Sequence, residues 1–98
     1  MIRDLINIHD ARVIKNRLRN EFDSHKFIEA FVDRLPDEYR AIRERYTRDA
    51  DRKANSLIAR FLSANQSELE ITKVENRKSK SENVHKKQTS CALWRKNS

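Results

Sequence analysis

Glycine is missing from this chain of 98 residues, and cysteine and proline occur once each. Without glycine there is no Gly-rich phosphate loop, dinucleotide-binding fingerprint or nucleophile elbow, because each needs that residue at a tight turn or close approach. The lone Cys91 cannot form an internal disulfide. The histidines, His9, His25 and His85, are far apart and lack any paired Cys/His ligand spacing. We therefore expect no cofactor and no metal site.

Long apolar runs are absent as well. The first ten residues already include Arg3, Asp4 and His9, and no later run approaches the roughly 18–20 apolar residues that span a bilayer. We expect no signal peptide, no membrane helix and a cytoplasmic protein.

Positive charge is the feature that the chain does have, and it is unevenly placed. Residues 73–98 carry eight Lys/Arg against two acidic residues, whereas residues 1–72 carry fourteen against thirteen, so nearly all of the net +7 belongs to the last quarter. A charge-balanced body with a basic segment suits a protein that brings one surface to a polyanion. Nucleic acid is the leading candidate partner.

Residues 1–22 are expected to form an N-terminal arm and a helix. Read as one helix, this segment has two apolar stripes on nearly opposite sides, and a break near Asp10 removes the conflict. Asp10 would then cap a helix that continues to Asn20.

Residues 23–98 are expected to form one domain that begins with helices over 24–35 and 36–47. Asp23 or Ser24 is the predicted cap of the first helix, and Pro36 suits the first turn of the second. Apolar side chains recur at helical spacing, which predicts the core-facing stripes. These stripes are Phe27, Ile28, Phe31, Val32 and Leu35 in the first helix, and Tyr39, Ile42 and Tyr46 in the second.

A third helix is expected over residues 50–65, capped by Asp49 or Asp51. Its apolar stripe contains Ala54, Ile58 and Phe61, and Phe61 joins Phe27 and Phe31 in the predicted core. Near its end, Asn65 could supply the left-handed conformation that glycine usually gives. At 100° per residue, four polar side chains gather on the face opposite the stripe. They are Arg52, Ser56, Arg60 and Ser63.

Residues 70–95 allow two interpretations. Their Lys/Ser/Asn composition is typical of disorder, but a disordered tail would leave the apolar group around Trp94 exposed. The favoured alternative is a β-hairpin in which Ile71–Val74 pairs with a strand near Val84 or Cys91, and the basic stretch between them forms a loop or wing. Trp94 would then fill the core with its indole N–H on a carbonyl, and Cys91 would be a small buried hydrophobe.

The expected arrangement, mainly α with a small C-terminal β-hairpin, resembles small bacterial winged helix-turn-helix-like proteins with an extra N-terminal helix. The resemblance covers residues 23–94 and is a pattern without a diagnostic motif. It depends on Ser24–Ile28 opening the first helix, Ile58–Ser63 in the third, and Lys80–Val84 with Ala92–Trp94 closing the sheet. The chain departs from the pattern by having no glycine in the wing.

The resemblance implies binding to double-stranded DNA, with the third helix in the major groove and the wing along the backbone, in a bacterial or mobile-element regulator. DNA is favoured over RNA because the aromatic side chains are needed in the core. Arg52, Ser56, Arg60 and Ser63 are the candidates for base readout. The candidates for phosphate contact are Lys53, Arg77, Lys78, Lys80, Lys86 and Lys87.

Other interpretations remain open. A polar helix face and a Lys-rich loop are commonly just solvated surfaces. The same fold could serve as a protein interaction module, or form a homodimer, with the N-terminal helix as the interface. Enzyme activity is least favoured: a small nuclease would need His25 or His85 as its base, neither has a visible partner, and His25 is expected to be exposed in a first helical turn.

Overall fold

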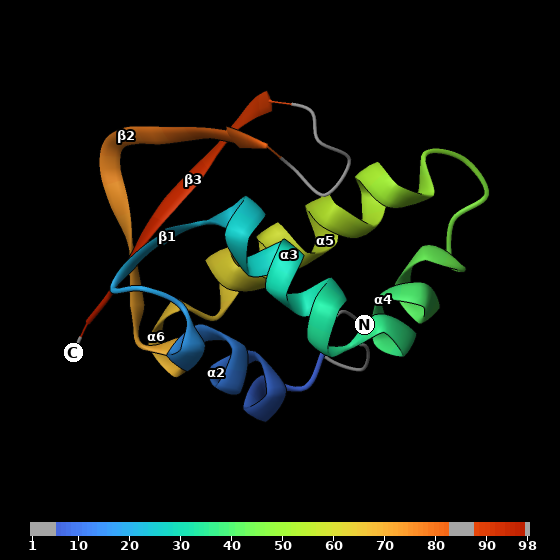
Figure 1. Cartoon of the computed structure of the whole chain (residues 1–98), viewed down its shortest axis with the longest axis horizontal. Coiled ribbons are helices and arrows are strands. Elements are labelled where there is room, and N and C mark those ends of the chain that lie inside the picture. Colours follow the sequence, from blue (N-terminus) through green and yellow to red (C-terminus); the bar gives the residue numbers. More distant parts are fainter. Residues whose placement is uncertain (1–5, 83–87, 98) are drawn as a thin grey trace.

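The computed structural model describes residues 6–82 and 88–97, with side chains described for residues 6–74 and 91–97. The described part is mainly helical and includes a three-stranded antiparallel sheet. Along the chain the elements are α2 (Ile8–Arg17), β1 (Glu21–Asp23), α3 (Ser24–Arg34), α4 (Pro36–Arg43), α5 (Ala50–Ala64), α6 (Gln66–Leu69), β2 (Ile71–Glu82) and β3 (Gln88–Lys96) (Figure 1).

The helix α2 begins and ends earlier than the sequence predicts. Its cap is Asn7, whose Oδ1 accepts from the backbone N–H groups of His9 and Asp10 at 2.8 and 3.4 Å. The predicted cap at Asp10 is therefore wrong, since the first turn is already satisfied three residues earlier. The helix ends at Arg17, not at Asn20, because the chain must become extended to enter β1.

The helices α3 and α4 lie where the apolar periodicity predicts them. Asp23 caps α3, with its Oδ1 accepting from the N–H of Lys26 at 2.8 Å. Pro36 opens α4, which ends at Arg43 instead of residue 47. Beyond Arg43 the backbone forms tighter turns in which the N–H groups of Arg45 and Tyr46 donate three residues back.

The helix α5 agrees with the predicted third helix to within one residue at its end. The left-handed residue is not Asn65, however, whose φ is −121°. Asn65 instead donates from Nδ2 to the carbonyl of Phe61 at 2.8 Å, and α6 follows it directly. Glu70, with φ 56°, makes the left-handed turn that leads into β2.

The sheet has the order β1-β3-β2, so β3 is its central strand. The predicted hairpin is present, but residues 71–73 pair with residues 96–94, further along than predicted. After a register shift, Ser79 lies opposite Cys91, while Val84 falls outside the described residues. The basic stretch 77–82 is consequently a strand and not a loop. The strand β1 was not predicted.

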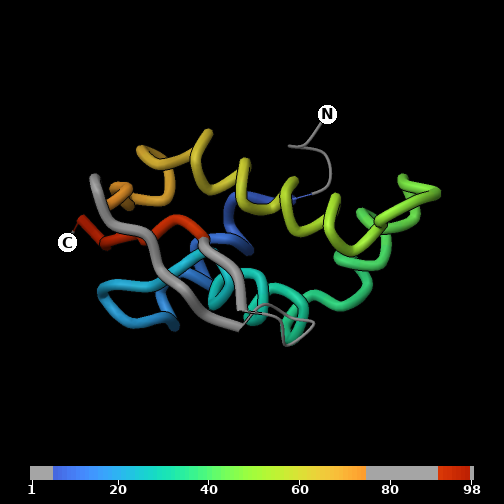
Figure 2. Tube along the Cα trace, turned by 90° about the horizontal axis from the view of Figure 1, so that it is seen from above, coloured from blue at the N-terminus to red at the C-terminus, as the bar shows by residue number. Residues whose placement is uncertain are grey.

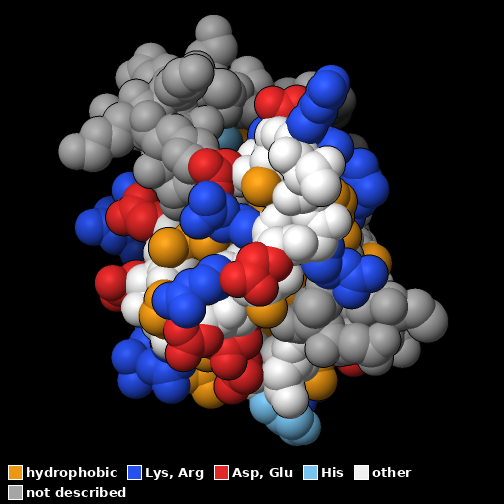
Figure 3. Space-filling view, turned by 90° about the vertical axis from the view of Figure 1, so that its right-hand side faces the viewer, with side chains coloured by type: hydrophobic (Ala, Val, Ile, Leu, Met, Phe, Trp, Pro, Cys, Tyr) orange, Lys and Arg blue, Asp and Glu red, His pale blue; other side chains and the backbone are white. Residues whose placement is uncertain are grey.

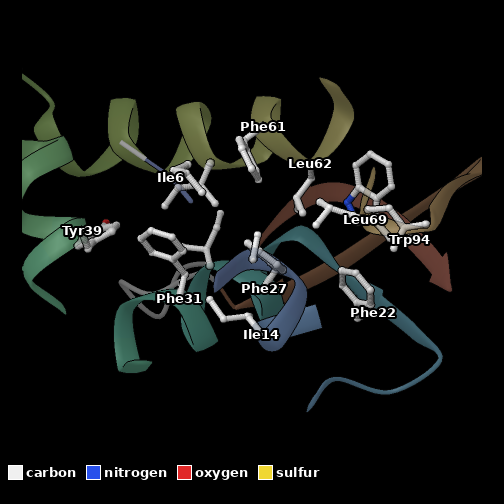
Figure 4. Close-up of a cluster of buried hydrophobic side chains, with 14 of the residues drawn as sticks. Ile6, Ile14, Phe22, Phe27, Phe31, Tyr39, Phe61, Leu62, Leu69 and Trp94 are labelled. Atoms are coloured by element: carbon white, nitrogen blue, oxygen red, sulfur yellow. The ribbon is translucent and has the colours of Figure 1, made fainter. Parts of the chain in front are cut away.

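The core lies between the helices and the inner face of the sheet. Figure 4 shows Phe61 and Leu62 pointing from α5 toward Phe27 of α3, with Trp94 of β3 at one end of the cluster. Trp94 is 1% exposed, and its Nε1 donates to the hydroxyl of Ser24 at 2.9 Å, not to a carbonyl as predicted. The buried set is Ile6, Ala11, Ile14, Phe22, Phe27, Ile28, Phe31, Tyr39, Ile42, Ala54, Ile58, Phe61, Leu62, Leu69, Ile71 and Trp94.

The layers leave one long side of α5 facing solvent. Figure 2 shows α5 running along the upper edge of the molecule, with α3 in its lower part. The α4–α5 connection, residues 44–49, lies at one end of the long axis, and the loop after α2 lies at the other end in both views (Figures 1 and 2). None of the helices in the described part of the chain combines the length and the apolar character needed to cross a membrane.

Candidate nucleic-acid interface

The four candidate base-reading residues lie on one exposed face of α5. Arg52, Ser56, Arg60 and Ser63 are all solvent-exposed, and their spacing places them within a narrow sector of the helix. The row rises about 16 Å along the helix axis, at 1.5 Å per residue. We call these four residues the α5 face.

The opposite side of α5 is fixed in the core. Ala54, Ile58 and Leu62 are 0% exposed and Phe61 is 1% exposed, so the helix cannot rotate without breaking the core. Two polar contacts hold its first half against α4. Arg43 Nε lies 2.6 Å from Asp51 Oδ1, and the Tyr39 hydroxyl donates to Asn55 Oδ1 at 2.7 Å. The α5 face is therefore presented in a fixed orientation.

The two arginines of the α5 face differ in their surroundings. Arg52 Nη2 lies 3.2 Å from Asp49 Oδ2 in an exposed ion pair. Arg60 has no ion pair or hydrogen bond to any residue within the described ranges. Because an exposed ion pair is worth only about 0–1 kcal/mol, Arg52 can exchange its partner for another anion at little cost. Arg60 can bind an anion without first giving up an ion pair.

Lys53, predicted to contact phosphate, sits at the edge of the α5 face. Its Nζ lies 5.5 Å from the centroid of the Tyr46 ring, a cation–π arrangement that leaves the ammonium exposed. Of the other candidates, Arg77, Lys78 and Lys80 lie in β2, but their side chains are outside the description. Lys86 and Lys87 fall outside the described residues altogether.

The structure adds two arginines that the sequence did not single out, Arg45 and Arg48. Both are exposed in the α4–α5 connection, directly before α5. The run of charges in residues 43–53 was the available signal, with five Lys/Arg against three acidic residues. Figure 3 shows this side of the molecule with Lys/Arg and Asp/Glu side chains intermingled. What this surface can bind therefore depends on which of its Lys/Arg side chains already form ion pairs with Asp/Glu side chains.

The structure describes one of the two histidines that were weighed for catalysis. His25 is 8% exposed at the start of α3, where it was predicted to be exposed, because this end of α3 packs against the sheet. His85 lies outside the described residues. Within the described ranges, no three His, Cys, Asp or Glu side chains are grouped so that they could hold a metal ion. Cys91, predicted to be buried, is half-buried.

Tyr39 lies at the back of this region, and the pKa of its hydroxyl departs from its ordinary value. Burial raises the pKa of its hydroxyl above 10.0, the Asp51 carboxylate adds to the rise, and the Arg43 guanidinium opposes it. Tyr39 therefore stays a neutral hydrogen-bond donor to Asn55 at neutral pH. It holds α5 to α4 and does not reach the α5 face.

Comparison of the chain with protein-family models, with curated proteins and with solved structures finds no match in any of the three.

Proposed function

We propose that this protein binds double-stranded DNA through the α5 face, with the side chains of that face in the major groove. One observation carries the proposal: a helix fixed by a buried apolar row presents an exposed row of two arginines and two serines. Arginine makes bidentate hydrogen bonds to guanine, and serine reaches base edges or phosphates. The major groove, about 12 Å wide, admits a helix of this kind.

The proposal includes a winged helix-turn-helix-like architecture for residues 23–94. In it α3, α4 and α5 are the three helices, and β2 with β3 is the wing. The element order and the position of the hairpin after the last helices support this assignment. The wing would place Arg77, Lys78, Lys80, Lys86 and Lys87 on phosphates, which gives affinity without sequence choice. In a cell, such a protein would act as a transcriptional or mobile-element regulator.

The first experiment is a titration of a labelled mixed-sequence DNA duplex, followed by fluorescence anisotropy at several salt concentrations. We expect binding in the range of about 10⁻⁴–10⁻⁶ M that is typical of non-specific complexes, weakening steeply with salt. A variant with Arg77, Lys78, Lys80, Lys86 and Lys87 changed to Ser should lower the salt slope by about 0.9 for each residue that contacts a phosphate.

Two comparisons decide between DNA and a general polyanion. Polyglutamate as competitor should displace the duplex poorly, because it has no groove for α5. A single-stranded DNA and an RNA duplex should bind more weakly than the DNA duplex. Equal binding to polyglutamate, or no duplex binding at low salt, would contradict the proposal and favour a protein partner.

Base readout is tested with Arg60→Ala after a preferred site has been selected. Loss of one bidentate arginine should cost about 1–3 kcal/mol and relax the preference at one base position. Arg19→Ala removes the same charge in the loop after α2 and is the matched control. If both variants weaken binding equally and leave the site preference unchanged, Arg60 does not read a base.

Dimerisation through α2 is a separate proposal. Among the described residues, Val13 on α2 is the one large hydrophobic side chain that is exposed, at 36%. A dimer through this helix would therefore have a small apolar centre. Sedimentation of the wild-type chain and of Val13→Glu tests it.

A further inference from the structure

The α4–α5 connection contains arginines that the proposed function does not use. Arg45 and Arg48 are exposed, and neither makes a hydrogen bond or ion pair through its side chain to a residue in the described part of the chain. They lie seven and four residues before Arg52, in the connection that leads into α5.

The acidic side chains at the start of α5 are already engaged. Asp49 is paired with Arg52 at 3.2 Å and Asp51 with Arg43 at 2.6 Å. Each pair neutralises one arginine with one aspartate. What remains in residues 43–53 is Arg45, Arg48 and Lys53 against Glu44, an excess of positive charge that faces solvent.

The connection is also held in place by contacts with α4, α5 and the core. After α4, the N–H of Tyr46 donates to the carbonyl of Arg43 at 3.0 Å, and the half-buried Tyr46 ring packs against the core. Lys53 lies over the same ring, and the Arg43–Asp51 pair joins the end of α4 to the start of α5. A segment held in this way binds a partner with a smaller loss of conformational entropy than a free loop.

We infer that the α4–α5 connection is a second phosphate-binding surface, in which Arg45 and Arg48 contact the DNA backbone beside the groove that receives α5. Exposed arginines without a carboxylate partner fit phosphate oxygens, for which the guanidinium fork is well shaped. This inference rests on the proposed function and extends it. Phosphate contacts made by the connection would then add to those proposed for the hairpin and fix the helix along the groove.

The test changes Arg45 and Arg48 together to Ser and measures affinity for the same labelled duplex across salt concentrations. The control changes Arg17 and Arg19 to Ser, which removes the same charge at the opposite end of the molecule (Figure 1). The Arg45/Arg48 variant should lower the salt slope by about 1.8, since each lost phosphate contact removes about 0.9. The control should lower it by less than half as much.

The outcomes separate this inference from the proposal on which it rests. If the wild-type protein binds and the two variants lose the same slope, only net charge matters and the inference is wrong. It is also wrong if the Arg45/Arg48 variant binds like the wild type while Arg60→Ala weakens binding, although the α5 proposal then stands. Absence of wild-type binding overturns both. Circular dichroism of each variant, expected to match the wild type, shows that the exposed substitutions leave the fold intact.

Discussion

At the scale of single residues, the contact between Trp94 and Ser24 joins the sheet to the start of α3. The Trp94 N–H donates to Ser24 Oγ at 2.9 Å, and the Ser24 hydroxyl is 3.5 Å from the Ala92 carbonyl. Sequence reasoning placed Trp94 in the core correctly, because a large apolar side chain is unfavourable in water. It could not name Ser24 as the partner, since 70 residues separate the two and no local pattern relates them.

Replacing Ser24 by Ala should destabilise the protein more than an equivalent exposed change. The substitution leaves the buried indole N–H of Trp94 without an acceptor, which costs about 1–3 kcal/mol. Ser56→Ala on the α5 face is the control and should change the free energy of unfolding by less than about 0.5 kcal/mol. Urea unfolding of both variants measures the difference. Equal values would show that the hydrogen bond contributes nothing net.

Tyr39 gives the protein a pH dependence in the alkaline range. Burial raises the pKa of Tyr39 in the folded state above the 10.0 of the unfolded chain, so the folded state keeps the phenol proton to higher pH. The stability that this provides is complete below pH 10 and is lost as the pH rises through the folded-state pKa. In Tyr39→Phe the free energy of unfolding should therefore fall less steeply above pH 10 than in the wild type. Tyr46→Phe is the control, and the same loss of slope in both variants would contradict this assignment.

At the scale of elements, helices with strong apolar periodicity were predictable and short elements were not. The stripe from Phe27 to Leu35 predicts α3, and the stripe from Ala54 to Leu62 predicts both α5 and its exposed face. By contrast, β1 is three residues long, too short to show an alternation of its own. It exists because Phe22 pairs with Trp94 across the sheet, a contact that only the folded chain creates.

The α4–α5 connection explains what was missed at the candidate site. Arg45 belonged to the helix predicted over residues 36–47, but α4 ends at Arg43, so its place in the connection did not follow from the sequence. Arg48 lies between two predicted helices, where no helix face can be assigned. Likewise, the sequence did not show that Asp49 would pair with Arg52 and make no side-chain cap for α5. Capping and ion pairing compete for the same carboxylate, and tertiary geometry decides between them.

An aspartate that caps a helix through a hydrogen bond should stabilise the protein more than an aspartate that only forms an exposed ion pair in the first turn. Asp23→Ala removes the cap of α3 and should cost about 1 kcal/mol. Asp37→Ala removes an equal charge from the first turn of α4, where the carboxylate only pairs with Arg40 at 3.4 Å on an exposed surface, and should cost less than about 0.5 kcal/mol. Thermal unfolding of both variants compares them. A cost for Asp37→Ala that equals or exceeds that for Asp23→Ala would contradict the role of the cap.

At the scale of the whole molecule, the basic segment and the core share the same stretch of chain. Residues 73–98 hold most of the net positive charge, and the same range includes β3, which pairs with both other strands. Trp94, in that strand, is buried among residues from the helices. The basic hairpin proposed as the wing therefore cannot be removed without removing part of the core.

A chain that ends at residue 87, before β3, should therefore fail to fold and not merely fail to bind. It would lose Trp94 and leave β1 and β2 without their common partner, and burial of one such aromatic side chain is worth about 3–5 kcal/mol, a large part of a small domain's stability. We expect the truncated chain to lose its helical circular dichroism and its cooperative unfolding, whereas a chain ending at residue 96 should keep both. If the chain ending at 87 remained cooperatively folded, the helices would form a core without the sheet, and the hairpin would be an appendage whose contribution to DNA binding could be measured by deletion. Because we expect the opposite, the charge substitutions in the connection and the hairpin are the sound way to separate binding from folding.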